Sequence, residues 1–175
     1  MGSEFASESI FFVNLHLNLT IIKKYMKKLL LLLSLFSVFA CKKEKSAEEQ
    51  LAFDIELIKK YITDKSLTAL STPEGVYYTI DVAGTGTQMP TPSNIVVAKY
   101  KGSFLDNTVF EENTKGFESR LSGVILGWQI GFQKFKKGGK GKLLIPSGLA
   151  YGNVKQGSIP KNSVLIFDVE LVDIK

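Results

Sequence analysis

The stretch GVILGWQIGFQKFKKGG, from Gly123 to Gly139, contains the chain's one tryptophan, Trp128, and no acid, histidine, cysteine or serine. It therefore lacks the usual groups for nucleophilic attack or proton transfer. The 175-residue chain adds few of them, because it has a single cysteine, Cys41, and a single histidine, His16. A disulfide within the chain is thus impossible. The composition of this stretch instead favours chemistry performed by an apolar surface that excludes water.

Phosphate and nucleic-acid chemistry find little support in the sequence. Gly84 and Gly86 begin a G-x-G pattern, but no third glycine or helix follows, and GGKGK at 138–142 lacks the pattern of a phosphate-binding loop. The formal net charge of +5 is partly carried by lysines before residue 29 and is otherwise dispersed. We expect no cofactor, no metal and no nucleic-acid partner.

A targeting segment precedes the domain. MKKLLLLLSLFSVFAC runs from Met26 to Cys41, with two lysines before an apolar run too short for the roughly 20 residues that span a bilayer. These features predict a signal peptide over residues 26–40. VFAC resembles the bacterial lipoprotein cleavage box, in which the cysteine is lipidated. We expect a lipid anchor on Cys41 and a location in the cell envelope, periplasmic or surface-facing. The alternative is a buried thiol at the end of a core helix.

Residues 1–25 differ from the rest of the chain. MGSEF is typical of a cloning scar, and the following apolar segment is interrupted by asparagines, His16 and lysines. We interpret residues 1–25 as vector-derived or translated upstream sequence, with the natural start at Met26. The alternative is a second hydrophobic segment.

A helix is predicted over residues 47–63, within the stretch 41–72 that also holds the lipidation site and a tether. Ser46 and Glu49 form a capping box at its start. Its apolar residues fall on one helical face: Leu51, Ile55, Ile58 and Ile62. The sequence leaves three roles open for this helix, which are packing on the domain, acting as a spacer, or forming a dimer.

The remaining residues, 73–175, have the pattern of one α+β domain. Asp106–Asn107 is a hairpin turn signal. A helical stripe runs from Trp128 to Phe135, with Gly138 as its expected C-terminal cap after a basic last turn. Alternating and β-branched segments predict strands at 76–82, 95–105, 108–112, 140–146 and 163–174. Many strands and one short helix indicate an antiparallel sheet wrapped on a helix.

Specific segments of this domain occur in the order and spacing of a known family. VAKYKG, GVILGWQIGFQKFKKGGKGKLLIP, LAYG and SVLIFDVEL resemble FKBP-type peptidyl-prolyl isomerases, and the resemblance extends from Pro73 to the C-terminus. It implies a five-stranded antiparallel half-barrel around one short helix, with a proline-binding pocket between them. It also implies an isomerase of proline-containing polypeptides that assists folding outside the cytoplasm. A binding or holdase module without catalysis is the alternative.

Carried over by position, the resemblance assigns the apolar part of this pocket. Trp128 would form the floor under the substrate proline ring. Tyr100 and Phe110 would be wall residues on the sheet, and Ile159 and Phe167 would complete the far wall. The alternative for each of these side chains is an ordinary core residue.

The resemblance also assigns a rim. Val124 and Ile125 would form it, with the Ile125 backbone N–H bonding a substrate carbonyl, and Tyr151 would offer its hydroxyl to another. Two positions depart from the family pattern. Glu111 stands where an aspartate is usual, and Phe117 would supply a further wall aromatic only if a bulge shifts it.

Overall fold

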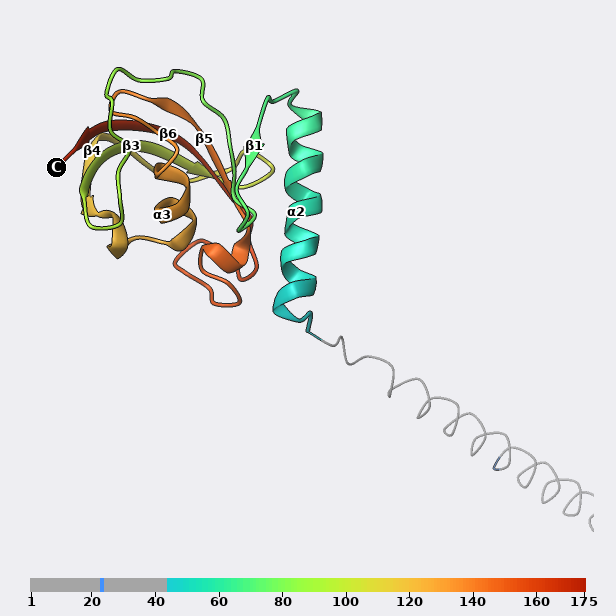
Figure 1. Cartoon of the computed structure of the whole chain (residues 1–175). Coiled ribbons are helices and arrows are strands. Elements are labelled where there is room, and N and C mark those ends of the chain that lie inside the picture. Colours follow the sequence, from blue (N-terminus) through green and yellow to red (C-terminus); the bar gives the residue numbers. More distant parts are fainter. Residues whose placement is uncertain (1–22, 24–43) are drawn as a thin grey trace, which may run out of the picture. The chain divides into compact units, whose positions relative to one another are not determined.

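The computed structural model describes Lys23 and residues 44–175 (Figure 1). The chain divides into two compact units after Glu44, and the fold below is that of Lys45–Lys175. The predictions for residues 1–25, the signal peptide at 26–40 and the anchor at Cys41 lie outside the described residues. Within the described part of the chain, no helix is long and apolar enough to cross a membrane.

An antiparallel sheet curves around a short helix, which confirms the predicted α+β class. The helix is α3 (Leu126–Phe132), and Figure 1 shows it inside the curve of the sheet, with the longer α2 on the other side. The sheet has the order β1-β2-β5-β6-β3-β4, so six strands are present where five were expected. The extra one is a two-residue edge strand. The strands are β1 (Leu70–Ser71), β2 (Tyr77–Tyr78), β3 (Ile95–Ser103), β4 (Val109–Arg120), β5 (Lys140–Ile145) and β6 (Leu165–Ile174).

Two strands differ in length from their predictions. The segment 76–82 forms a ladder only at Tyr77–Tyr78, because Asp81 and Val82 both direct their amides to one carbonyl, that of Lys140. That bulge interrupts the pairing. β4 extends well beyond the predicted 108–112 despite its polar composition, since it is an edge strand with much of its surface in solvent. The predicted hairpin turn is confirmed, with Asn107 at φ +67°.

The helix that carries Trp128 is shorter than its apolar stripe suggested. It ends at Phe132 with Gln133 as its C-cap, so the predictions of a basic last turn and of Gly138 as the cap are wrong. The chain leaves the helix in tight turns, and the Gly138 amide donates to the Leu171 carbonyl at 2.7 Å. This bond to β6 holds the segment against the sheet, where it cannot continue the helix.

Alternation along the central strands β5 and β6 creates two apolar layers. Odd-numbered residues face the main core, which contains Leu143, Ile145, Leu165, Phe167 and the helix α3 residues Trp128 and Phe132. Even-numbered residues face a second cluster, in which Leu144 and Ile166 meet Ile58 of α2. Both faces of these strands are therefore covered at this end of the sheet.

Helix α2 (Ala47–Asp64) packs on the sheet. Its capping box is confirmed, because Ser46 Oγ accepts from the Glu49 amide while Glu49 accepts from the Ser46 amide. The helix residue Ile58 is fully buried between α2 and the sheet. Of the three roles left open by the sequence, packing on the domain is the one that the structure displays.

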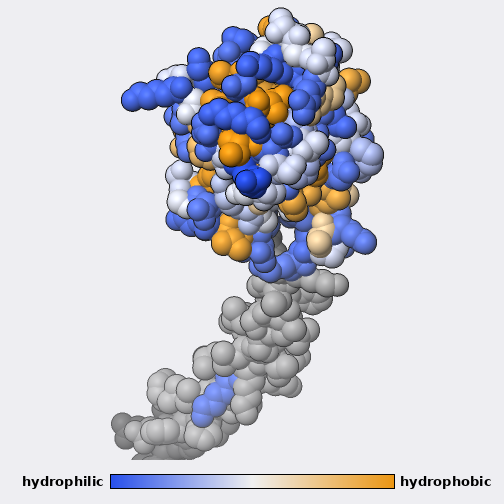
Figure 2. Space-filling model, turned by 60° about the vertical axis from the view of Figure 1, so that its left-hand side comes forward, coloured by the Kyte–Doolittle hydropathy of each residue, from blue (hydrophilic) through white to orange (hydrophobic). Residues whose placement is uncertain are grey.

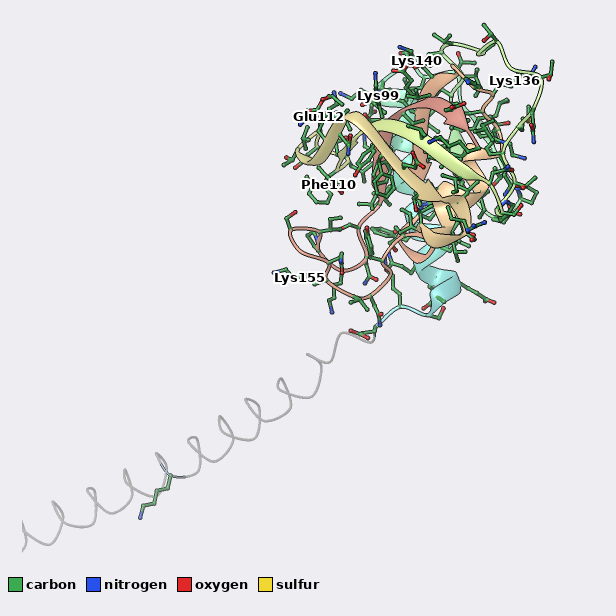
Figure 3. All side chains as sticks on the ribbon, turned by 90° about the vertical axis from the view of Figure 1, so that its left-hand side faces the viewer. Lys99, Phe110, Glu112, Lys136, Lys140 and Lys155 are labelled. Carbon is green, nitrogen blue, oxygen red and sulfur yellow. The ribbon has the colours of Figure 1, made fainter. Side chains whose placement is uncertain are left out.

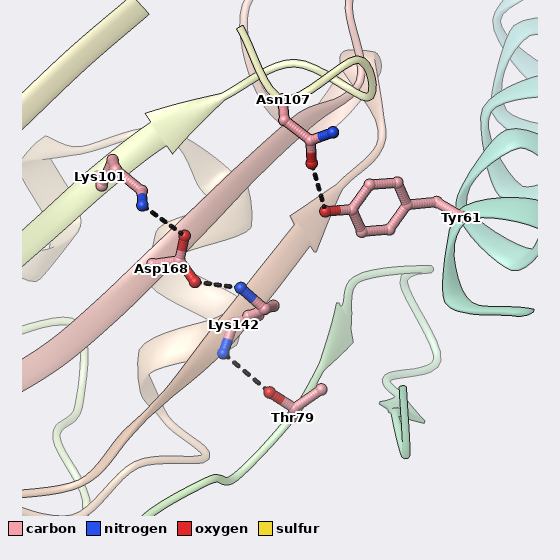
Figure 4. A network of polar contacts seen from close by, with 6 residues as sticks. All are labelled: Tyr61, Thr79, Lys101, Asn107, Lys142 and Asp168. Carbon is pink, nitrogen blue, oxygen red and sulfur yellow. Dashed lines mark hydrogen bonds and ion pairs between the residues drawn. The ribbon is translucent and has the colours of Figure 1, made fainter. Parts of the chain in front are cut away.

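Beyond α2, the same face of the sheet carries charged side chains that pair across strands. Asp168 accepts from Lys142 and lies 3.8 Å from the ammonium of Lys101, and the Lys142 amide donates to Thr79 Oγ1 (Figure 4). Exposed pairs of this kind contribute at most about 1 kcal/mol each. This face is a solvated surface, and the apolar pocket lies on the opposite side.

Candidate functional site

A pocket of about 330 Å³ opens between α3, the sheet and the loop after β5. All predicted site residues line it except Phe110 and Ile159. The lining residues are Tyr100, Glu111, Phe117, Gly123, Val124, Ile125, Trp128, Tyr151 and Phe167. A pocket of this size holds a small apolar ring and the peptide bonds beside it.

Aromatic rings in edge-to-face contact form the base of the pocket. Trp128 is 4% exposed, and its ring centroid lies 4.9 Å from that of Tyr100 and 5.2 Å from that of Phe167. Phe117 adds a further contact at 6.1 Å from Trp128. Each such pair contributes about 0.5–1.5 kcal/mol beyond the area it buries, so these contacts stabilise the arrangement of the base.

A glycine sets the depth at which Trp128 lies. A Cβ atom on Gly127 would overlap the Ile145 side chain of β5. Helix α3 can therefore approach the sheet closely enough for the indole to pack in the core only because residue 127 has no side chain.

A bulge places Phe117 in the pocket. In the pairing of β3 with β4, Ala98 lies opposite Phe117, whereas Tyr100 lies opposite Asn113, so β4 contains extra residues between the two pairs. This irregularity lets Phe117 face Tyr100 at 6.1 Å between ring centroids. The shift that the sequence prediction required is thus present.

Phe110 and Ile159 lie behind or beside the lining. The Phe110 ring contacts Phe167 at 5.7 Å and Phe104 at 5.0 Å, while Ile159 is 6% exposed in the main core. Figure 3 shows Phe110 projecting from the sheet on the side where the loop with Lys155 lies. Phe110 thus extends the aromatic surface outward from the pocket.

One hydrogen bond orders the polar side of the pocket. The Tyr100 hydroxyl donates to Glu111 Oε1 at 2.7 Å, so the longer carboxylate still reaches a partner on the wall. Burial, reinforced by the Glu111 hydrogen bond, raises the pKa of Tyr100 well above that of an ordinary tyrosine. Burial and the nearby Glu111 charge also raise the pKa of Tyr151. Both hydroxyls therefore stay protonated at neutral pH and can donate.

Three donors at the pocket have no hydrogen-bond partner among the described residues. They are the Tyr151 hydroxyl, the Ile125 backbone N–H and the buried Trp128 Nε1. Of the three, Trp128 Nε1 is the one that is fully buried, and buried polar groups without partners are uncommon in folded proteins. The pocket thus combines an apolar base with unused donors, which suits a ligand that carries carbonyl groups.

Sequence reasoning missed two residues at this site. Gly123 lines the pocket, and Phe104 packs on Phe110. Gly123 adjoins the predicted rim, so its position in the sequence was a usable signal, whereas the Phe104–Phe110 contact depends on the hairpin register. In the part of the chain that the structure describes, no group of three or more His, Cys, Asp or Glu residues is placed to hold a metal ion.

This fold and this pocket define a class of protein. Residues 86–172 match the profile of the FKBP-type peptidyl-prolyl cis-trans isomerase family. The chain belongs to this family, whose members are isomerases.

Particular relatives agree with the assignment. The chain is 43% identical over 137 residues to the FKBP-type peptidyl-prolyl cis-trans isomerase FkpA of Escherichia coli, a match that covers 77% of this chain and 50% of that protein. It is 42% identical over 135 residues to FkpA of Buchnera aphidicola, covering 75% of this chain and 53% of the relative. The chain thus spans about half the length of these curated relatives.

Solved structures give the same result. The crystal structure of FkpA from Escherichia coli aligns with a TM-score of 0.63 and 27% identity, over 100% of this chain and 97% of that one. A peptidyl-prolyl cis-trans isomerase from Pseudomonas syringae aligns with a TM-score of 0.65 and 27% identity, over 76% of this chain and 98% of that one.

Proposed function

We propose that this chain catalyses cis–trans isomerisation of X–Pro peptide bonds in polypeptides and thereby assists protein folding. The observation that carries the proposal is the aromatic-based pocket whose rim bears the unpartnered Tyr151 hydroxyl and Ile125 N–H. Trp128 would contact the proline ring, and the two donors would orient the carbonyls on either side. Membership of an isomerase family supports the same assignment.

This reaction suits a pocket without an acid–base pair. Twisting the amide costs about 20 kcal/mol because resonance is lost, and it breaks no covalent bond. In the twisted state the nitrogen recovers its lone pair and the charge separation falls, so an apolar environment tolerates that state better than the planar one. A 10⁶-fold acceleration requires the pocket to favour the twisted form by about 8 kcal/mol.

A peptide isomerisation assay tests the proposal. An X–Pro peptide isomerises in about 10–100 s unaided, so catalysis is readily measured against that background. A protein of residues 26–175 or 44–175 should accelerate the isomerisation of this peptide. A Trp128→Ala variant that remains folded should not accelerate it. An unaccelerated rate with the folded parent protein would reject the proposal.

The pH dependence provides a second test. From Pro73 onward the chain has no histidine or cysteine, and the raised pKa values of Tyr100 and Tyr151 keep both hydroxyls protonated. We expect kcat/KM to stay within about twofold between roughly pH 6 and pH 8, unlike the bell-shaped profile of acid–base catalysis. An inflection in that range, abolished by Glu111→Gln, would show a titrating carboxylate in the mechanism.

The same two shifts affect stability at alkaline pH. A raised tyrosine pKa means that the folded state favours the protonated hydroxyl. This contribution to the free energy of unfolding is fully present below the ordinary tyrosine pKa near 10 and is lost as the pH rises through the folded values. Activity and stability should therefore fall together as the pH rises through the range in which these two hydroxyls ionise.

A second candidate function is peptide binding without catalysis, as a holdase chaperone. It is favoured by exposed apolar side chains close in sequence to pocket residues, namely Val109, Leu126 and Val154, which are 49%, 54% and 61% exposed. The face shown in Figure 2 likewise presents separate hydrophobic patches among hydrophilic residues. If the protein suppressed aggregation of a client but showed no isomerase activity, the holdase function would be favoured over the isomerase function.

We also propose that the protein works in the cell envelope, attached through Cys41. The support is the VFAC box after a short apolar run, and two or more acyl chains give stable membrane binding where one is marginal. Cys41→Ser is expected to release the protein to the soluble fraction or leave it unprocessed, as shown by fractionation and mass. A cleaved variant that still fractionates with membranes would refute lipid anchoring.

The proposed domain boundaries are 26–40 for the signal peptide, 41–72 for the anchor, tether and helix, and 73–175 for the isomerase domain. Dimerisation through the helix near residues 47–63 stays a prediction that sedimentation would decide. Ile58 on that helix already packs against the sheet. A dimer would therefore use the exposed side of the helix, where Phe53 is 42% exposed.

A further inference from the structure

Helix α2 carries a buried acid that the proposed reaction does not use. Asp54 is 0% exposed, although it lies in the middle of the helix on the face that packs against the domain. Aspartate is almost never fully buried unless its oxygens are paired. A simple packing helix would place an apolar residue here, so the acid requires a specific explanation.

The Asp54 carboxyl group is held by three donors. Its Oδ2 accepts from the Ser147 amide at 2.8 Å and from the Ser147 hydroxyl at 2.6 Å. Its Oδ1 accepts from Gln50 Nε2 at 2.7 Å. Two of the three bonds thus connect α2 with one residue of η3 (Ser147–Leu149), the turn that follows β5.

Ser147 is also the hub of the segment that presents Tyr151. Its carbonyl accepts from the Ala150 amide at 3.0 Å and from the Gly152 amide at 2.8 Å, which are the two residues flanking Tyr151. Ser147 itself is 1% exposed, whereas the loop beyond Gly152 is exposed. A continuous series of hydrogen bonds therefore runs from Asp54 through Ser147 to both sides of Tyr151.

Helix α2 also touches the other loop near the pocket. The Tyr61 hydroxyl donates to Asn107 Oδ1 at 3.3 Å in the turn between β3 and β4, just before Phe110 (Figure 4). The helix thus contacts loops leading to both Phe110 and Tyr151. Asp54 makes the better-buried and shorter of these contacts.

We propose that Asp54 is a positioning residue for the reaction: through Ser147 it fixes the 147–152 segment and so holds the Tyr151 hydroxyl at the rim of the pocket. This inference rests on the proposed isomerase function. It extends the functional unit to a helix that precedes the residues matched by the family profile, 86–172. The structural reason is that a loop residue cannot orient a substrate carbonyl unless its own backbone is held.

The test compares Asp54→Ala with Ile58→Ala, a control on the same helix that removes apolar contacts with Leu144 and Ile166 but leaves the Asp54–Ser147 bonds in place. We expect Asp54→Ala to lower kcat/KM for an X–Pro peptide at least fivefold and Ile58→Ala less than twofold. Asp54→Asn keeps an acceptor oxygen and should recover most of the loss. Equal losses in the two alanine variants would overturn the proposal.

A double-variant cycle separates positioning from general stability. If Asp54 acts through the Tyr151 hydroxyl, Asp54→Ala should change kcat/KM less than twofold in a Tyr151→Phe background. An undiminished fivefold loss in that background would show that Asp54 acts by another route. Should Asp54→Ala not fold, Ser147→Ala removes the hydroxyl bond to Asp54, and its effect on kcat/KM should likewise disappear in the Tyr151→Phe background.

Amide hydrogen exchange provides a readout that does not need catalysis. In Asp54→Ala the Ser147 and Gly152 amides should exchange at least tenfold faster than in Ile58→Ala, because their bonding series is broken only in the first variant. Unchanged exchange would refute the anchoring of this segment. Inactivity of the parent protein would reject the proposed function instead, and the exchange result would still decide whether Asp54 holds the loop.

Discussion

Replacing Tyr151 with alanine is expected to lower kcat/KM for an X–Pro peptide at least about tenfold, which corresponds to 1.4 kcal/mol of transition-state stabilisation. The physical reason is the loss of a hydroxyl that has no partner among the described residues and that lines the pocket. Tyr151 is half-buried beside the aromatic base, and a hydrogen bond from its hydroxyl to a substrate carbonyl is stronger there than in bulk water.

Phe110→Ala should produce a loss of similar size. Its ring contacts Phe167 edge to face and joins Phe104 in the extended aromatic surface, so truncation would admit water beside the pocket. Steady-state kinetics on variants whose circular dichroism matches the parent would measure both effects.

Two controls belong to this experiment. Tyr151→Phe removes the hydroxyl and keeps the ring, and it should show most of the Tyr151→Ala loss if orientation of the carbonyl dominates. Phe53→Ala removes a half-exposed ring that lies on α2 beneath the Lys45 ammonium, away from the lining residues. It should leave kcat/KM within twofold. Activity within twofold of the parent in both Tyr151→Ala and Phe110→Ala would mean that the catalytic pocket lies elsewhere.

Gly141→Ala is expected to destabilise the domain by about 3 kcal/mol, the upper part of the usual range for overpacking. Gly141 lies in β5, and a Cβ atom there would overlap the carbonyl oxygen of Thr79. Thr79 cannot move easily, because its amide donates to the Lys142 carbonyl while its hydroxyl accepts from the Lys142 amide. The backbone of one strand must therefore shift.

Denaturant unfolding measures this effect, and Gly148→Ala is its matched control. A Cβ atom at Gly148 would meet nothing within 4 Å, so this substitution should change the free energy of unfolding by less than about 1 kcal/mol. The midpoint temperature of Gly141→Ala should fall by roughly 10 °C. Equal stability of the two variants would show that β2 and β5 are not packed as closely as the structure places them.

Much of the fold could be predicted because it depends on local patterns. The capping box at Ser46 and Glu49, the hairpin turn at Asp106–Asn107 and the apolar strands β5 and β6 are all read from neighbouring residues. The errors fall where a local pattern competes with a distant bond. The stripe through Phe135 predicted a longer helix, but the Gly138 amide is bound by β6 and the helix ends at Phe132.

The sequence by itself determined the chemistry available to the pocket: aromatic and apolar side chains, few titrating groups and glycines for close packing. The tertiary structure decided which of these side chains meet. An irregularity opposite Ala98–Tyr100 sets the register that brings Phe117 beside Tyr100, while Phe110 and Ile159 lie outside the pocket lining. Side chains alternate between the faces of a strand, so register decides which face each residue reaches, and register depends on partners far along the chain.

The position of α2 is a second feature that depends on the tertiary structure. The apolar face of the helix is evident in the sequence, but its partner is the outer face of β5 and β6, where Leu144 and Ile166 lie between residues that face the main core. Continuous apolar runs in those strands do not reveal which residues point each way. Asp54 could therefore be recognised as the partner of Ser147 only in the folded chain, because 93 residues separate the two and burial leaves the carboxyl group no water to bind.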